Sequence, residues 1–157
     1  MKKYIVLFII ALGFIACKNS ADNKTTTESP EATQPPVSTT SASGLLTGCY
    51  EYISDKNTIR FEITGVDNGV VGTLIYDFFE KDKNTGTFSG SVNGDHLFGT
   101  YTFRSEGMES SREVAFLINK NQLIEGYGEL NADGTAFVDK SKIAYNSNMP
   151  LTRGDCD

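Results

Sequence analysis

Hydrophobic and polar residues alternate with a period of two through most of the chain after residue 45. In residues 58–64 the apolar residues Ile59, Phe61 and Ile63 are separated by polar ones. This period is typical of β-strands with one buried face. No stretch shows a helical period over more than a few turns. We expect about eight strands, at residues 46–53, 58–64, 70–79, 87–92, 97–103, 114–118, 123–130 and 135–138.

Short turns rich in glycine, asparagine and aspartate separate these segments. Asn68-Gly69, Asn93-Gly94 and Asp133-Gly134 are examples, and such pairs supply the positive φ angles of tight hairpins. Short links favour an all-β antiparallel meander. No long crossover is visible, so an up-and-down barrel is favoured over a sandwich. A barrel of eight strands holds side chains or one small ligand.

The first 16 residues have the composition of an export signal. Met1-Lys2-Lys3 is positively charged, and residues 4–15 are apolar except for Gly13. This run of 12 residues is shorter than the ~20 that a membrane-spanning helix needs. A charged start followed by a short apolar core predicts a secretory signal peptide over residues 1–16.

The end of this signal resembles the lipobox of bacterial lipoproteins, in the residues Phe14-Ile15-Ala16-Cys17. Phe14 and Ile15 depart from the usual leucine and small residue, whereas Ala16 and Cys17 match. The resemblance implies that Cys17 is acylated and anchors the protein to a lipid bilayer. Lys18 differs from the aspartate that retains some lipoproteins in the inner membrane, so we expect the outer membrane of the cell envelope. The alternative is an ordinary signal peptide with a chance cysteine.

Residues 17–44 form a second, polar segment after the signal. Residues 18–44 contain eleven serines and threonines, three prolines and one sizeable apolar side chain, Val37. Such a composition cannot bury enough surface to offset the entropy of ordering. We expect a disordered tether, acting as a spacer or carrying O-linked glycans. Residues 45–157 then form the folded domain.

The domain resembles known proteins in pattern. Gly48-Cys49-Tyr50 is similar to the Gly-x-Trp that opens the barrels of lipocalins and avidins, although tryptophan is absent here. Residues 112–117 and 124–128 are similar to small uncharacterised lipoproteins of Flavobacteria, within the Bacteroidota. These resemblances imply a calycin-like barrel and no known activity.

Two cysteines, Cys49 and Cys156, remain if Cys17 is acylated. Two cysteines in an exported domain are typical of a disulfide. The bridge would close a loop of over a hundred residues, worth about 4–5 kcal/mol in the chain-entropy model. A metal site or a reactive thiol pair is the alternative, but the sequence has neither a histidine near these cysteines nor a Cys-x-x-Cys motif to support it.

Charge and motifs exclude several function classes. Residues 45–157 carry 10 basic and 17 acidic side chains, which argues against a general nucleic-acid-binding protein. His96 is the only histidine and lies in a turn. Zinc motifs, EF-hand loops and phosphate-binding glycine loops are absent. We therefore expect no metal, no cofactor and no enzyme, with a hydrolase based on the carboxylates Glu125 and Glu129 as a weak alternative.

The candidate ligand-binding residues are Arg104, Arg112, Glu125, Tyr127 and Glu129. If Val114 and Phe116 face the barrel interior, the same period directs Arg112 inward. An inward arginine needs a carboxylate partner, either Glu125 or Glu129. A polar cluster over an apolar floor is typical of a small-ligand site, whereas a solvated hairpin with rim ion pairs is the alternative.

Two main hypotheses follow for function. In one, the barrel binds a small ligand or an envelope protein, and a cavity of several hundred cubic ångströms with Arg112 in its mouth would favour the ligand. In the other, a packed barrel of structural or inhibitory type acts through its outer face.

Overall fold

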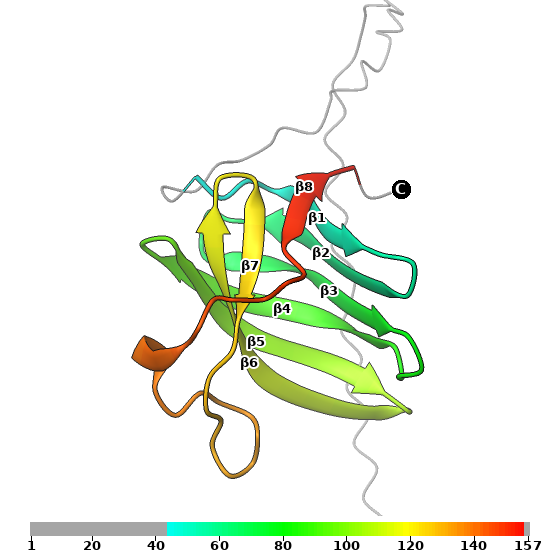
Figure 1. The fold of residues 1–157 in the computed structure, drawn as a ribbon. Helices are drawn as coiled ribbons and strands as arrows, with labels where there is room; N and C mark the ends of the chain where they lie inside the picture. Colours follow the sequence, from blue (N-terminus) through cyan, green and yellow to red (C-terminus); the bar gives the residue numbers. More distant parts are fainter. Residues whose placement is uncertain (1–43, 156–157) are drawn as a thin grey trace, which may run out of the picture. The chain divides into compact units, whose positions relative to one another are not determined.

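The computed structural model describes residues 44–155 and contains a closed antiparallel β-barrel, so the predicted fold class is confirmed. Each strand pairs with the next along the chain, and the last pairs with the first (Figure 1). The elements are β1 (Gly48–Ile53), β2 (Asn57–Gly65), β3 (Val70–Phe78), β4 (Asn84–Asn93), β5 (His96–Ser105), β6 (Met108–Asn119), β7 (Gln122–Gly126), the 3-10 helix η1 (Lys140–Lys142) and β8 (Leu151–Gly154).

The segments predicted to be a signal peptide and a tether, up to residue 43, lie outside the described residues, as do Cys17 and Cys156. Within residues 44–155, no helix has the length and apolar character that crossing a membrane requires.

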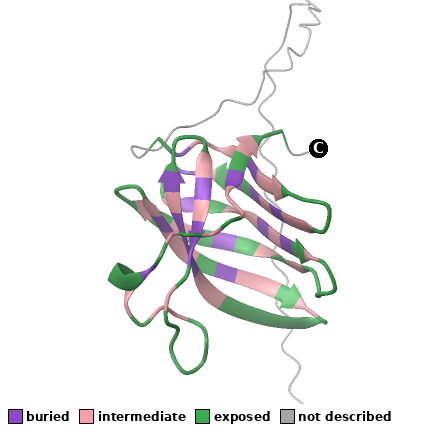
Figure 2. Ribbon diagram, in the orientation of Figure 1, coloured by how far each residue is buried: buried purple, intermediate pink, exposed green. Residues whose placement is uncertain are grey.

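The alternating residues of each strand fill the barrel interior. Register places Ile59 of β2 between Tyr52 of β1 and Tyr76 of β3, all on the inner face. The rings of Phe61 and Phe88 meet edge to face, with centroids 4.9 Å apart. The largest side chains that are fully buried include Tyr101, Phe61, Phe88 and Phe116. Along the strands, buried segments are interspersed with more exposed ones (Figure 2). The middle of the barrel is therefore packed, which leaves ligand binding to its ends and outer wall.

The barrel closes through a strand that the sequence pattern did not indicate. Residues 135–138, expected to be a strand, lie instead in a long connection, residues 127–150, which we call the arm. The closing strand is β8, where Leu151 is fully buried and pairs with Leu123 of β7. β7 also ends at Gly126 rather than at Leu130. The prediction for residues 135–138 was wrong because an isolated bridge between Leu130 and Phe137 folds the arm on itself.

The two ends of the barrel differ. At one end Leu45, which is 1% exposed, joins the hydrophobic core just before β1 begins. The opposite end, which we call the far end, carries the β1–β2, β3–β4 and β5–β6 turns. Three exposed apolar residues, Ile53, Phe79 and Met108, lie at these turns.

Candidate functional site

Arg112 lies inside the barrel near its far end, as the period of β6 predicts. It pairs in register with Tyr101 of β5, whose side chain is fully buried. The guanidinium carbon lies 5.4 Å from the ring centroid of Tyr76, 5.9 Å from that of Tyr101 and 5.6 Å from that of Phe103. Such contacts stabilise a cation electrostatically. The aromatic rings therefore hold the charge of Arg112 in place.

The Nε atom of Arg112 is buried and has no hydrogen-bond partner. Within residues 44–155, none of the ion pairs involves this arginine. Arg112 as a whole is half-buried, so the remaining nitrogens of its guanidinium are not enclosed as Nε is. The structure thus leaves hydrogen-bonding capacity on this guanidinium unused.

Glu125 of β7 is the buried carboxylate of the same region, at 6% exposure. Its Oε1 accepts a hydrogen bond of 2.8 Å from the Tyr76 hydroxyl, and its Oε2 accepts one of 3.3 Å from the Tyr127 hydroxyl. Burial raises the pKa of Glu125, although these hydrogen bonds and the charge of Arg112 act in the opposite direction. Burial also raises the pKa of Tyr76 well above its usual value. Tyr76 therefore remains a neutral donor at physiological pH.

A cavity of about 120 Å³ lies beside Arg112 and Glu125, at the point where β6 and β7 separate. The ladder between the two strands ends at the pair Ala115–Gly126, and the chain beyond Gly126 leaves the barrel wall. We call this cavity the Arg112 pocket. It is lined by Arg112, Glu113, Val114, Glu125, Gly126, Tyr127, Gly128, Leu130 and Phe137.

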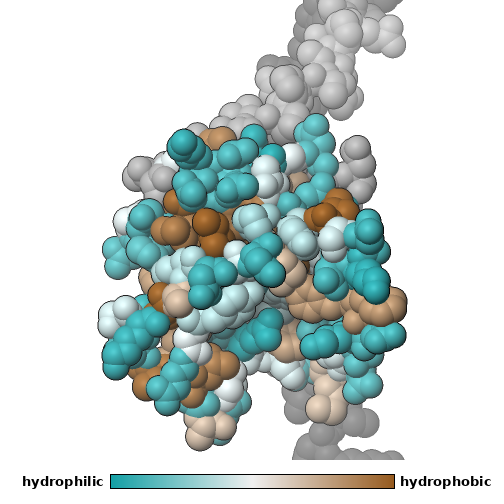
Figure 3. Space-filling model, in the orientation of Figure 1, coloured by the Kyte–Doolittle hydropathy of each residue, from teal (hydrophilic) through white to brown (hydrophobic). Residues whose placement is uncertain are grey.

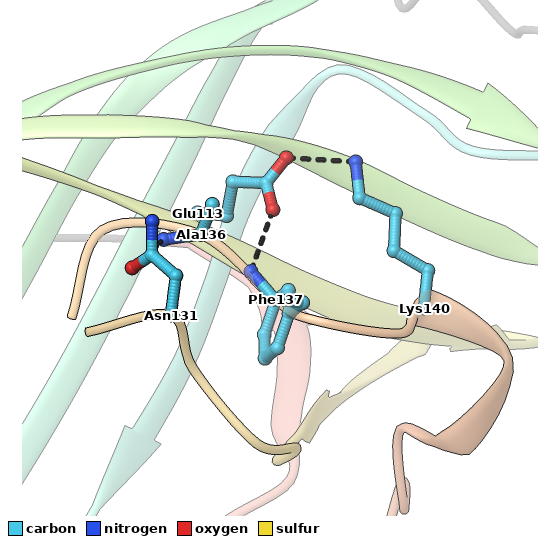
Figure 4. Close-up of polar contacts among 5 residues, drawn as sticks. All are labelled: Glu113, Asn131, Ala136, Phe137 and Lys140. Carbon is cyan, nitrogen blue, oxygen red and sulfur yellow. Dashed lines mark hydrogen bonds and ion pairs between the residues drawn. The ribbon is translucent and has the colours of Figure 1, made fainter. Parts of the chain in front are cut away.

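The arm forms the outer wall of the Arg112 pocket and is fixed there by Glu113 of β6. The carboxylate of Glu113 accepts hydrogen bonds from Lys140 Nζ at 2.7 Å and from the Phe137 amide at 2.9 Å (Figure 4). Asn131 Oδ1 accepts a bond of 3.3 Å from the Ala136 amide and braces the turn of the arm. Partial burial would raise the pKa of Glu113, but the bonds from Lys140 and Phe137 outweigh it and lower the pKa. Glu113 is therefore neutralised by Lys140.

The structure brings together three of the five candidate residues, Arg112, Glu125 and Tyr127. Arg104 is exposed on β5, where its Nε lies 3.7 Å from the exposed Glu109. Glu129 is exposed on the arm and does not line the pocket. Arg112 and Glu125 face one pocket without the direct ion pair that was expected, since no nitrogen–oxygen pair between them lies within 4.0 Å.

Cys49 lies in β1, is 7% exposed and stands opposite Gly154 of β8. The residue opposite Cys49 is therefore only two positions before Cys156 in the sequence, although Cys156 itself lies outside the described part. The Cys49–Cys156 disulfide stays a prediction.

A second hollow lies on the outer wall, between the β4–β5 hairpin and the arm, with a volume of about 770 Å³. We call it the outer groove. His96 lines it, with its Nδ1 2.7 Å from Asp95 Oδ1 and its ring 4.8 Å from the ring of Tyr145. The sequence indicated only a turn histidine here, because no local pattern predicts that the arm folds back over this hairpin. The groove's other lining residues are Ser91, Asn93, Gly94, Phe98, Lys140, Ser141 and Ile143.

The face formed by β6, β7 and the arm carries separate hydrophobic patches with hydrophilic residues between them (Figure 3).

Among residues 44–155, no three His, Cys, Asp or Glu side chains gather closely enough to hold a metal ion. The chemistry available is therefore that of one arginine, one buried carboxylate and several tyrosines.

A scan against protein-family models found no match to this chain, and searches of the curated proteins and of the solved structures found none either.

Proposed function

We propose that this protein is a lipid-anchored component of the bacterial cell envelope whose β-barrel binds a small polar ligand in the Arg112 pocket. The observation that carries the proposal is the guanidinium of Arg112, which is held against three aromatic rings, lines the pocket and makes none of the ion pairs within residues 44–155. The Nη groups at the end of this guanidinium can donate to an acceptor that a ligand supplies. Charge-assisted hydrogen bonds of this kind are about twice as strong as neutral ones.

The size of the pocket limits the ligand. An apolar cavity of about 150 Å³ holds one benzene molecule. A pocket of about 120 Å³ accordingly takes a ligand slightly smaller than benzene, or one end of a longer molecule. The packed middle of the barrel excludes deeper insertion, since Phe61, Phe88 and Phe116 are at most 1% exposed.

Anchoring is supported by the lipobox-like residues before Cys17 and by the polar residues that follow. Two or three acyl chains would hold the protein stably, because each buried methylene contributes ~0.8 kcal/mol. In bacterial cells, the variant Cys17→Ala should leave the membrane fraction. If this variant remains in that fraction after a high-salt wash, acylation of Cys17 is not the anchor.

Ligand binding is tested by saturation-transfer NMR of the intact protein with a panel of small water-soluble metabolites. We expect at least one compound to bind the wild type and Arg104→Met but not Arg112→Met. The two variants remove the same side chain, one from the exposed surface and one from the pocket. A panel without any Arg112-dependent compound would contradict the proposal.

A second candidate function follows from the packed barrel and the outer groove. The groove is wide and open, and its aromatic residues His96, Phe98 and Tyr145 suit contact with an envelope protein. A photo-crosslinking residue at the exposed position Asn93 should then give one discrete crosslinked product in cells. The control places the photo-crosslinking residue at the exposed position Ser54, at the far end, where it should not give that product.

A further inference from the structure

We infer that the ligand of the Arg112 pocket carries a carboxylate and an ammonium group close together, as a small free α-amino acid does. This inference rests on the proposed function and adds the chemical class of the ligand. It follows from the two opposite charges that face the pocket without touching each other.

The first observation is the charge on the pocket wall. Arg112 supplies a positive charge, and Glu125, once ionised, supplies a negative one. The third charged residue of the lining, Glu113, is already paired with Lys140 at 2.7 Å. The open hydrogen-bonding capacity in the pocket thus consists of one cation and one anion.

The second observation is how these two charges are held apart. The ring of Tyr76 packs against the guanidinium of Arg112 at 5.4 Å, while its hydroxyl donates to Glu125 Oε1 at 2.8 Å. The same tyrosine therefore contacts both charged groups, the cation with its ring and the carboxylate with its hydroxyl. Tyr127, which is 47% exposed, holds Oε2 of Glu125 at 3.3 Å from the solvent side.

Both groups retain capacity for a ligand. A carboxylate has about four acceptor sites, and the two tyrosines occupy two of those on Glu125. An ammonium group has three donors and could use another of these sites. The planar guanidinium of Arg112 matches a carboxylate, to which it can donate two parallel hydrogen bonds.

Electrostatics disfavours ligands with a single charge. A simple acid attracted to Arg112 would bring its negative charge close to Glu125, and a simple amine attracted to Glu125 would bring its positive charge close to Arg112. Such repulsion is strong in a partly dry pocket, because the effective dielectric constant is well below that of water. A zwitterion meets an opposite charge at each end and leaves the net charge of the pocket unchanged.

Size agrees with this class. A pocket of about 120 Å³ is slightly smaller than the cavity of about 150 Å³ that holds benzene. Glycine and alanine are molecules of this size. Larger amino acids would have to extend past Tyr127 into solvent.

The test is isothermal titration calorimetry of the intact protein with three probes: glycine, acetate and methylammonium. We expect glycine to bind at least tenfold more tightly than either single-charge probe. Arg112→Met and Glu125→Gln should each weaken glycine binding at least tenfold. The matched surface variants Arg104→Met and Glu129→Gln should leave it unchanged, because both of these residues are exposed outside the pocket.

The outcomes separate this inference from the proposed function. Acetate binding as tightly as glycine would overturn the inference and leave a pocket for simple anions. If none of the three probes binds while the metabolite panel yields an Arg112-dependent compound, the ligand class is wrong and the binding function stands. If neither experiment detects Arg112-dependent binding, both fail. The comparison of probes uses wild-type protein and does not depend on the variants folding.

Discussion

Two glycines on neighbouring strands make room for the ring of Phe88, and replacing one of them tests the packing of the barrel. Gly90 of β4 and Gly99 of β5 are opposite each other in register, both on the inner face. A Cβ atom at position 99 would lie 2.3 Å from Cζ of Phe88 and 2.6 Å from the carbonyl oxygen of Ser89. Carbon atoms in contact are normally about 3.5–4.0 Å apart. Gly99→Ala therefore requires the ring or the strand to move.

The cost of this change can be bounded. Adding a methyl group to a well-packed core typically costs about 1–3 kcal/mol. Phe88 is 1% exposed and packs edge to face on Phe61, so its ring cannot shift without disturbing its neighbours. We expect Gly99→Ala to lower the free energy of unfolding by about 1–3 kcal/mol. In a domain of this size each kcal/mol corresponds to a drop of roughly 4 °C in melting temperature.

Urea unfolding followed by circular dichroism measures the effect. The control is Gly154→Ala, where an added Cβ meets no atom within 4 Å and should change stability by less than about 0.5 kcal/mol. Phe88→Leu removes Cζ of Phe88, the atom nearest to the added Cβ. Combined with Gly99→Ala, it should recover part of the lost unfolding free energy. Equal stabilities of Gly99→Ala and Gly154→Ala would refute the account of the packed interior.

Three further predictions concern individual side chains. The folded-state pKa of Glu125 is raised, so the stability that this residue contributes is present below its ordinary pKa of 4.5 and is lost as the pH rises through the folded value. The variant Glu125→Gln should therefore gain stability relative to wild type as the pH rises above 4.5. A stability difference that does not change with pH would contradict the burial of Glu125. The folded-state pKa of Glu113 is lowered, so the stability that this residue contributes is present above its ordinary pKa of 4.5 and is lost at acidic pH. The variant Lys140→Met, which removes the partner of Glu113, should lower the free energy of unfolding by about 1 kcal/mol or less at pH 7 and by less in acid, as measured by urea unfolding. The Tyr50 hydroxyl donates to the Leu46 carbonyl at 3.1 Å and accepts from its amide at 3.3 Å; Tyr50→Phe should lower stability by about 1 kcal/mol, and no change would show that this bond is not needed to hold the start of the barrel.

Most of the barrel could be predicted because its strands carry a clear period of two. Ile59, Phe61 and Ile63 alternate with polar residues, and all three are at most 1% exposed. The same period of two along β6 places Arg112 inside, on the face of Val114 and Phe116. Local alternation is sufficient here because each hairpin partner follows directly in the sequence.

The closing strand and the location of the pocket could not be predicted in this way. β8 contains one buried apolar residue, Leu151, in four, which is too few to show a period. The pocket exists because β7 ends at Gly126, where a Cβ would lie 2.4 Å from Ile143 and 2.7 Å from Tyr145 of the arm. This long-range contact sets the end of the strand, and the sequence around Gly126 contains no sign of it.

The same limitation explains the misplaced strand. Thr135 to Val138 alternates like a strand and lies in the arm, where the Glu113 amide donates to the Thr135 carbonyl at 2.7 Å. A short apolar alternation shows that a segment is extended but does not show that it belongs to the barrel.

The most direct test of the central claim is the NMR signal of the Arg112 Nε–H group during a titration with glycine. Because this nitrogen is buried, its proton should exchange slowly with water and be observable without ligand. We predict a saturable shift of the Arg112 signal and no shift of the signal from the exposed Arg104. An Arg112 signal that does not change up to saturating glycine, or one that shifts no more than that of Arg104, would contradict ligand binding by this pocket in the form described.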